Sequence, residues 1–403
     1  MNSWKLLLAG ASALALSTAA ASADSVRVGS AGGVTGPIAE LIAVVMNARN
    51  LAAQHVNDQG GLFDGQTYEL VLGDAACNPA NAVDAGNKLV NVDQVVAIIG
   101  PSCSGATNAM VQSVTIPAGV VNLSDSATAP SITDLDDNDL VFRVAPSDAY
   151  QGRSMAEYAI GKGMESVAVT YANDDYNTGL AQVFISSFQE LGGTITSEQM
   201  HEPEKASYRS ELATLSGGGD ADALVLFAYY GGSGITIVRN SLENGLFDTF
   251  LGADGMFDDV VIEQLGVENL AGTLEVAQAA SDPEAKAFQM FAEAFEETGE
   301  SAAAPYAAHG YDASFLMAMA IEKAGSTDRD AISAALREVA NAPGVEIFPG
   351  EWEKAKAAIA NGEDVNYQGA TGEIEFDDNG DVAGIYSINR VTEAGEWETE
   401  LLK

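Results

Sequence analysis

The chain has 403 residues, of which 58 are acidic and 18 are basic, and its formal net charge at pH 7 is −40. A surface this acidic repels nucleic acid and anionic lipid, which excludes proteins whose main role is to bind either. The acidity is compatible with a saline habitat and equally with plain solubility. The length exceeds one ordinary domain, so we expect two.

The first 23 residues have the pattern of a secretory signal peptide. Lys5 precedes the apolar run LLLAGASALALSTAA, and Ala21-Ser22-Ala23 matches a small-x-small cleavage site. The run is shorter than the roughly 20 residues of a membrane-spanning helix, and no cysteine stands at the cleavage site to carry a lipid. We therefore predict export to the periplasm of a Gram-negative cell, as a soluble chain that begins near Asp24.

After this leader, short β-rich runs alternate with helical patterns. VRVGSA precedes a segment whose apolar residues, from Ile38 to Val56, recur on one helical face, and Gly60-Gly61 ends it. Asn78-Pro79 is a good N-cap and first-turn pair for the next helix. The strand-like run VVAIIG follows, then another helical segment, and then the strand-like run AGVVNLS. Repeated β–α units of this kind predict a parallel sheet covered by helices on both faces.

A second β–α series starts after VFRVAP (residues 141–146). It runs from SVAVTYAND, through a helix at about 178–191, to TFLGAD and GTLEVAQ, and helical patterns then dominate residues 283–361. The tail GEIEFDDNGDVAGIYSINRV predicts a hairpin with Asp378-Asn379-Gly380 at its turn. The predicted fold class is α/β, with two doubly wound parallel-sheet lobes connected by several short crossings.

The two cysteines follow two strand-like runs, YELVLGDAA before Cys77 and VVAIIG before Cys103. Adjacent parallel strands would bring these two ends together, and an exported protein is oxidised, so we predict a Cys77–Cys103 disulfide. A bridged Cys103 cannot act as a nucleophile.

The catalytic templates that we tested do not fit. The start of a phosphate-binding loop at Gly100 has Ala106 where a lysine is required. Two near matches to the G-x-S-x-G nucleophile motif, at Gly100 and Gly231, both miss. The three histidines are widely spaced and form no metal-ligand pattern. We therefore predict a protein that is not an enzyme and needs neither a cofactor nor a metal.

Polar side chains recur where the predicted strands end. Hydroxyls follow VVAIIG and AGVVNL, tyrosines follow SVAVTYAND and end ALVLFAYY, and Asp254 ends TFLGAD. Ligands of doubly wound sheets bind at this edge. Hydroxyls and helix N-terminal N–H groups suit a carboxylate, and a lone acid suits an ammonium. Each residue also has a simpler explanation, such as helix capping for Ser104 or a turn position for Asp254.

The chain resembles the periplasmic Leu/Ile/Val-type binding proteins of ABC transporters, which share the type I periplasmic binding protein fold. The resemblance covers the mature chain and is carried by motifs in order: VGSAGGVTGPIAE, IIGPSCSGAT, LSDSATAPSIT, FRVAPSDAYQG, ANDDYNTGLAQ, FLGADG and GEIEFDDNGDV. It implies three crossings between lobes that close on the ligand. The expected N-terminal lobe is 24–146 with 279–384, and the expected C-terminal lobe is 147–278 with 385–403.

The same resemblance implies roles for individual residues. Ser104 and Thr128 would hold the carboxylate of an amino acid, the carbonyl of Ser126 would face the ammonium, and Asp254 stands where the family usually has a glutamate for that ammonium. Two tyrosines would close over the ligand. The implied ligand-binding set is Ser102, Ser104, Ser126, Thr128, Tyr176, Tyr230 and Asp254.

Two positions depart from the family pattern. Ser102 replaces an apolar residue and Leu41 replaces an aromatic one, so a polar side chain on the ligand is at least as probable as a branched aliphatic one. The resemblance implies an amino acid or a close analogue as ligand, the membrane permease subunits of a transporter as partner, and a monomer. A receptor for an amide or urea with the same fold is the main alternative.

Overall fold

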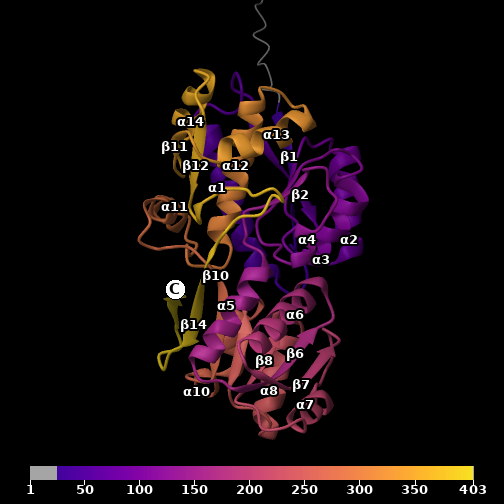
Figure 1. Ribbon diagram of the computed structural model, residues 1–403. Coiled ribbons are helices and arrows are strands. Elements are labelled where there is room, and N and C mark those ends of the chain that lie inside the picture. The colour runs from indigo at the N-terminus through magenta and orange to yellow at the C-terminus, as the bar shows by residue number, and fades with distance from the viewer. Residues whose placement is uncertain (1–24, 403) are drawn as a thin grey trace, which may run out of the picture.

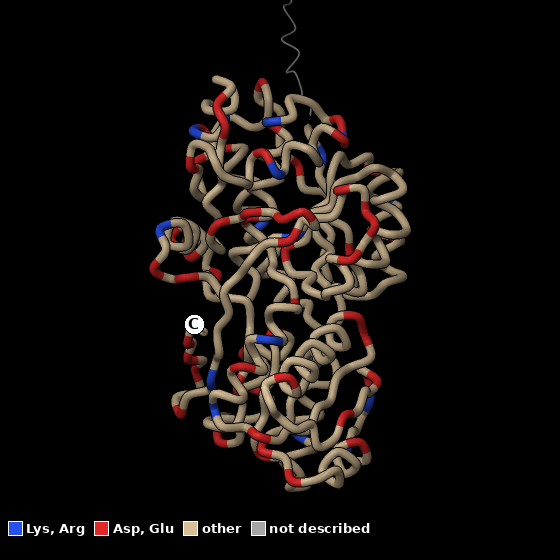
Figure 2. Tube along the Cα trace, viewed as in Figure 1, with Lys and Arg blue, Asp and Glu red and all other residues tan. Residues whose placement is uncertain are grey.

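The computed structural model describes residues 25–402, and the predicted leader lies outside these residues. Two lobes are visible in Figure 1, each built on its own sheet. We call the upper one the first lobe and the lower one the second lobe. Asp and Glu are spread over the outer loops and helices of both, with few Lys and Arg among them (Figure 2). Within residues 25–402, no helix combines the length and the apolarity needed to cross a membrane.

The first lobe contains a sheet in which every neighbouring pair of strands is parallel. In spatial order its strands are β2 (Thr67–Asp74), β1 (Ser25–Gly32), β3 (Ile98–Ile99), β4 (Asn122–Ser124) and β5 (Val141–Arg143). This order is that of a doubly wound sheet, with the strand order reversing beside β1 and β3. The predicted α/β class is confirmed.

The helices of the first lobe come from both halves of the sequence, and α12 is buried along most of its length against α1. Asn78 caps α2 as predicted, accepting from the backbone N–H groups of Ala80 and Asn81. The helices are α1 (Ala39–Asp58), α2 (Pro79–Asn87) continued by η1 (Lys88–Val92), α3 (Ser104–Met110) continued by η2 (Val111–Thr115), α4 (Pro130–Thr133), α11 (Lys286–Glu296), α12 (Ala307–Ala324), α13 (Arg329–Ala340) and α14 (Trp352–Ala360). A small sheet beside them contains β11 (Val345–Ile347), β12 (Val365–Gly369) and β13 (Gly372–Glu373).

The second lobe contains a mixed sheet whose two C-terminal strands are antiparallel to their neighbours. Its order is β15 (Trp397–Leu401), β14 (Ile385–Val391), β10 (Leu274–Ala280), β9 (Phe250–Ala253), β8 (Ala223–Phe227), β6 (Ser166–Ala172) and β7 (Thr194–His201). Its helices are α5 (Asp148–Gly161), α6 (Asp175–Glu190), α7 (Arg209–Ser216), η3 (Tyr230–Gly234), α8 (Ile235–Asn244), η4 (Asp254–Met256), α9 (Asp259–Leu265) and α10 (Val267–Leu270).

The chain passes between the two sheets three times: after β5, after β10 and after β13. The third passage corrects one sequence prediction, because the two arms of the expected hairpin do not pair. The turn itself is present, with the N–H of Gly380 donating to the carbonyl of Asp377 at 3.1 Å. However, β13 pairs with β12 and β14 pairs with β10. Strand propensity identified both arms, but it carries no information about which partner each arm finds.

A disulfide joins Cys77, just after β2, to Cys103, just before α3. Their Cα atoms are 5.3 Å apart, within the range that a disulfide requires. The predicted bridge is therefore confirmed. It ties the loop after β2 to the loop after β3, next to the edge of the sheet where the candidate site lies.

Candidate ligand-binding site

A pocket lies between the lobes at the carboxyl ends of their parallel strands, the edge at which doubly wound sheets bind ligands. Its cavity volume in this closed form is about 20 Å³. The first lobe contributes the start of α1, the loops after β3 and β4, and the residue before α12. The second lobe contributes the start of α6 and the ends of β8 and β9. The lining residues are Ile38, Leu41, Ile42, Ser102, Ser126, Tyr176, Tyr229, Asp254, Gly255 and Tyr306.

The two lobes are in contact around this pocket, so the structure is a closed form. The Asn108 amide on α3 donates to the carboxylate of Asp175 at the start of α6, with an N–O distance of 2.8 Å. A second polar contact joins Tyr306 of the first lobe to Asp254 of the second. The side chains of the pocket are consequently well covered, and Asp254 is only 6 % exposed.

Asp254 accepts hydrogen bonds on both carboxylate oxygens. Oδ1 accepts from the Tyr176 hydroxyl at 2.8 Å and from Nε2 of Gln151 at 2.6 Å, and Oδ2 accepts from the Tyr306 hydroxyl at 2.7 Å. Burial, followed by the charge of Asp254, raises the pKa of both tyrosines well above the usual value. They therefore remain protonated donors, and they hold the carboxylate of Asp254 in place.

Asp148 is a second buried acid close to Asp254, and the sequence-based set did not include it. It is the first residue of α5 and is fully buried. Burial, and then the negative charge of Asp254, raises the pKa of Asp148 well above its ordinary range, and the neighbouring Thr128 hydroxyl and Arg143 guanidinium offset part of this rise. A buried carboxylate with few partners is costly, and a ligand that carries a positive charge would stabilise it. The only local signal was the spacing of Asp148 and Gln151, which places both on one face of α5.

Tyr229 lines the pocket, whereas its neighbour Tyr230 does not. Tyr229 stacks on Tyr176 with ring centroids 5.3 Å apart. Tyr230 instead lines a neighbouring hollow with Gly36, Pro37 and other residues. Successive side chains at the end of an extended strand project to opposite sides. An alignment that is shifted by one residue at the end of ALVLFAYY therefore places Tyr230 in the pocket instead of Tyr229.

Ser104 and Thr128 lie next to each other, behind the residues that line the pocket. The Ser104 hydroxyl accepts from the backbone N–H groups of Thr128 at 3.2 Å and of Ala129 at 3.1 Å. It does not cap its own helix α3. The buried Thr128 hydroxyl lies beside the carboxylate of Asp148. Two backbone N–H groups, now bonded to Ser104, and one hydroxyl therefore lie together at this point, and donors of this kind bind carboxylates.

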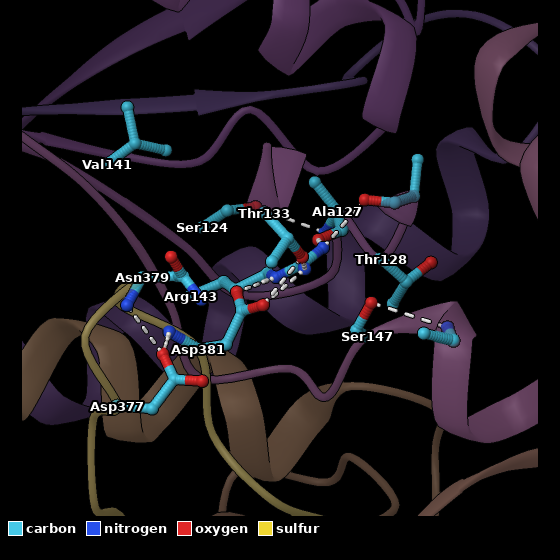
Figure 3. Close-up of polar contacts among 12 residues, drawn as sticks. Ser124, Ala127, Thr128, Thr133, Val141, Arg143, Ser147, Asp377, Asn379 and Asp381 are labelled. Atoms are coloured by element: carbon cyan, nitrogen blue, oxygen red, sulfur yellow. Dashed lines mark hydrogen bonds and ion pairs between the residues drawn. The ribbon is translucent and has the colours of Figure 1, made fainter. Parts of the chain in front are cut away.

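The loop that carries Thr128 is held from behind by Arg143 (Figure 3). The fully buried guanidinium donates to the carbonyl of Ala129 at 2.9 Å and to that of Ala127 at 3.4 Å. It also donates to the carboxylate of Asp381, with Nη2 and Oδ2 2.8 Å apart. Asp381 belongs to the third passage between the lobes, so this ion pair joins the loop after β4 to the connecting segment.

The last two predicted residues, Ser102 and Ser126, form one wall of the pocket. Ser102 Oγ lies 3.1 Å from Nη2 of the buried Arg49, and Ser126 Oγ donates to the carbonyl of Ser102 at 2.9 Å. Arg49 in turn forms an ion pair with Asp125, with an N–O distance of 2.6 Å. Among residues 25–402, no cluster of three or more His, Cys, Asp or Glu side chains has the arrangement of a metal site.

The family model described as "Receptor family ligand binding region" matches residues 44–393. A Leucine-, isoleucine-, valine-, threonine-, and alanine-binding protein of Pseudomonas aeruginosa is 28% identical over 322 residues, which cover 78% of this chain and 83% of that protein. A substrate-binding protein of a chemotactic signal transduction system in Halobacterium salinarum is 26% identical over 397 residues, covering 94% and 90%.

The crystal structure of a leucine-binding protein from Thermotoga maritima superposes on this chain with a TM-score of 0.80 and 26% identity. The match covers 94% of this chain and 99% of that one. The expected two-lobed fold is therefore confirmed by a solved relative as well as by the strand order. Because the family model spans most of the sequence, the chain belongs to the family of receptor ligand-binding regions.

Proposed function

We propose that this protein is the periplasmic substrate-binding component of an ABC transporter, and that it captures a free α-amino acid between its lobes. The observation that carries the proposal is the polarity of the closed pocket. Asp254 lines the pocket from the second lobe, with the buried Asp148 near it. A cluster of backbone and hydroxyl donors around Thr128 lies on the first lobe, behind the lining residues. A ligand whose ammonium and carboxylate are close together matches both ends.

In this proposal Asp254 and Asp148 bind the ammonium, and Tyr176 and Tyr229 cover it. The N–H groups of the loop after β4, with the Thr128 hydroxyl, bind the carboxylate once Ser104 releases them. Each charge-assisted contact of this kind contributes roughly 1.5–3 kcal/mol. Because the two anchors lie on different lobes, the ligand makes all its contacts only in the closed form, and it shifts the population towards that form.

The cellular setting belongs to the same proposal. A leader over residues 1–23 would direct the chain to the periplasm, where it would act as a monomer and present its closed form to the permease subunits of the transporter. We also propose that the lobes end, and the hinge moves, after residues 146, 278 and 384. The relatives are named as an amino-acid-binding protein and as a substrate-binding protein of a chemotactic system, which supports a receptor rather than an enzyme.

The direct test is a thermal-shift panel on refolded protein from which any ligand has been removed. The panel includes amino acids, their amides, the corresponding decarboxylated amines, urea and aromatic carboxylates. A ligand that binds only the native state raises the free energy of unfolding by about 2.7 kcal/mol at a hundred times its Kd. We expect the amides and amines to shift the melting temperature far less than the parent amino acid, because each lacks one of the two charges.

The variant Asp254→Asn tests the acidic anchor. It keeps the shape of the side chain and removes the charge, so we expect binding to weaken by about 2–5 kcal/mol. Asp248→Asn, which removes an exposed acid from the same lobe, is the matched control. If a neutral amide or urea gives the largest shift while every amino acid gives none, the receptor for an amide or urea is the correct function.

A further inference from the structure

Several residues that line the pocket are not used by either charged end of an amino-acid ligand. The acids and tyrosines of the second lobe are used by the ammonium, and the loop around Thr128 is used by the carboxylate. Besides Gly255 and Tyr306, the remaining lining residues are Ser102 and Ser126 on one wall and the aliphatic side chains at the start of α1 on the other: Ile38, Leu41 and Ile42. This leftover space, which we call the side-chain subsite, would receive the side chain of the ligand.

The serine wall is backed by the ion pair of Arg49 and Asp125. Both side chains are fully buried. Arg49 also donates hydrogen bonds to the carbonyl of Ala31 at 2.8 Å and to the Ser30 hydroxyl at 3.1 Å. The two charges compensate each other behind the wall. The subsite therefore faces hydroxyl groups and offers no net charge to the ligand.

The contacts of the two serines fix which way their hydroxyl protons point. Ser126 Oγ donates to the carbonyl of Ser102 at 2.9 Å, and its alternative acceptor, Oδ1 of Asp125, is also inside the wall at 3.3 Å. Ser102 Oγ accepts from Arg49, which has only donors, so its own proton points to Oδ1 of Asp125 at 3.5 Å. Both protons are directed into the protein. What the wall presents to the pocket is the lone pairs of two oxygens.

We propose that Ser102 and Ser126 select an amino acid whose short side chain carries a hydrogen-bond donor, the hydroxyl of a threonine-like or serine-like ligand. The donor satisfies the serine lone pairs, and the methyl or methylene of the same side chain packs on Leu41 and Ile42. Ser102 is only 3 % exposed and its oxygen already accepts one hydrogen bond, from Arg49. An aliphatic side chain would leave the second lone pair of this oxygen buried without a donor. A charged side chain on the ligand would find no opposite charge in this subsite, because Arg49 and Asp125 neutralise each other, and an anionic one would in addition meet only acceptors.

This inference rests on the proposed capture of an amino acid, and the test separates the two. Threonine and valine have the same shape and differ only in a hydroxyl or a methyl at one branch. Their Kd values are measured by calorimetry on ligand-stripped protein. We expect threonine to bind at least about tenfold more tightly than valine, because a site built around a hydroxyl discriminates strongly against an analogue that lacks it.

Ser102→Ala with Ser126→Ala should lower the preference for threonine to about threefold or less, mainly by weakening threonine binding. Ser126→Ala alone loses only the hydrogen bond to the carbonyl of Ser102, and it should also lower the preference for threonine over valine. This single variant keeps the test valid if the double variant does not fold. The matched control is Ser314→Ala, which removes a buried hydroxyl of α12 that does not line this pocket.

A valine affinity equal to or above that of threonine in the unmodified protein would overturn the subsite while leaving the amino-acid clamp intact. An unchanged ratio in both serine variants would overturn it as well. If no α-amino acid binds at all, the proposed function itself fails, which is a different result from a change in the threonine-to-valine ratio.

Discussion

Gly231 of the second lobe packs directly against the carbonyl group of Pro37 in the first lobe, and a methyl group built on Gly231 would overlap that oxygen. The contact exists only when the lobes are closed, and it requires a residue without a side chain. The same is true to a lesser degree of Gly179, where an added methyl would lie 3.0 Å from the ring of Pro130. Closure therefore depends on the absence of side chains at these positions.

Gly231→Ala should weaken ligand binding by about tenfold or more, or about 1.4 kcal/mol, because the methyl group opposes closure. The melting temperature of the ligand-free protein should change little, since the contact is absent in an open form. Small-angle scattering with saturating ligand should show a more extended variant. Gly161→Ala is the control, because a methyl group there meets no atom within 4 Å. Equal affinities of the two variants would contradict the role of Gly231.

Because the pKa of Asp148 is raised, we predict that ligand capture is coupled to the release of a proton from this residue. Burial raises the pKa of Asp148 in the closed, ligand-free protein, so the group takes up a proton more readily there, and an incoming ammonium favours the charged form. Affinity should therefore fall as the pH is lowered. Calorimetry in buffers of different ionisation enthalpy should detect a release of up to one proton, and Asp148→Asn should abolish it. An affinity of the unmodified protein that does not change with pH would contradict the coupling.

Two buried histidines predict a loss of stability in mild acid. His201 is held between the hydroxyls of Thr170 and Ser233, at 2.8 and 2.7 Å, and Nδ1 of His309 has no partner. Burial lowers the pKa of each to about 4. The unfolded chain binds these protons near its ordinary pKa, so stability is fully present above about pH 6.5 and is lost as the pH falls towards 4.

As the pH falls from 6.5 to 5, proton uptake by each of these histidines in the unfolded chain should lower the free energy of unfolding by at most about 2 kcal/mol. Denaturant titrations at several pH values measure this slope. His309→Gln cannot take up a proton, so its pH dependence should be shallower by the contribution of one histidine, whatever the substitution does to stability at neutral pH. Identical slopes for the variant and the unmodified protein would show that His309 does not titrate in this way.

The Cys77–Cys103 bridge predicts a chain without free thiols. Thiol titration of the denatured, unreduced protein should find almost none, since the sequence contains only these two cysteines. Replacing both by serine should lower the free energy of unfolding by about 3.5 kcal/mol, because the loop that the bridge closes becomes free in the unfolded chain. Two titratable thiols, or a double variant as stable as the parent, would count against the bridge.

Features that depend on local sequence could be predicted. Asn78-Pro79 identified the start of α2, and the two cysteines stood at the ends of strands that fold side by side. The hydroxyls after β3 and β4 and the acid after β9 could be found for the same reason, because the ends of parallel strands meet at one edge of a sheet. The hairpin expected around Asp378 failed because its two arms belong to different lobes.

Other parts of the candidate site could not be predicted, each for a physical reason. An acid in the first turn of a helix usually serves the helix itself, so Asp148 carried no distinguishing signal. Tyr306 reaches Asp254 from a segment 52 residues further along the chain, and only the tertiary fold brings them together. Arg49 lies on the otherwise apolar inner face of α1, where a charged side chain is stable only because Asp125 faces it.

The last part of the chain has a role in folding that follows from its path. Asp381 completes the ion pair of Arg143 in the first lobe, and β14 and β15 complete the sheet of the second. These residues follow all the other strands of both main sheets along the chain. Neither lobe can therefore complete its fold before this segment has been made, and the long separation between β10 and its partner β14 slows that step further. Removal of residues 381–401 would leave both lobes incomplete at once, so this segment acts as the common closing step of two otherwise separate folding units.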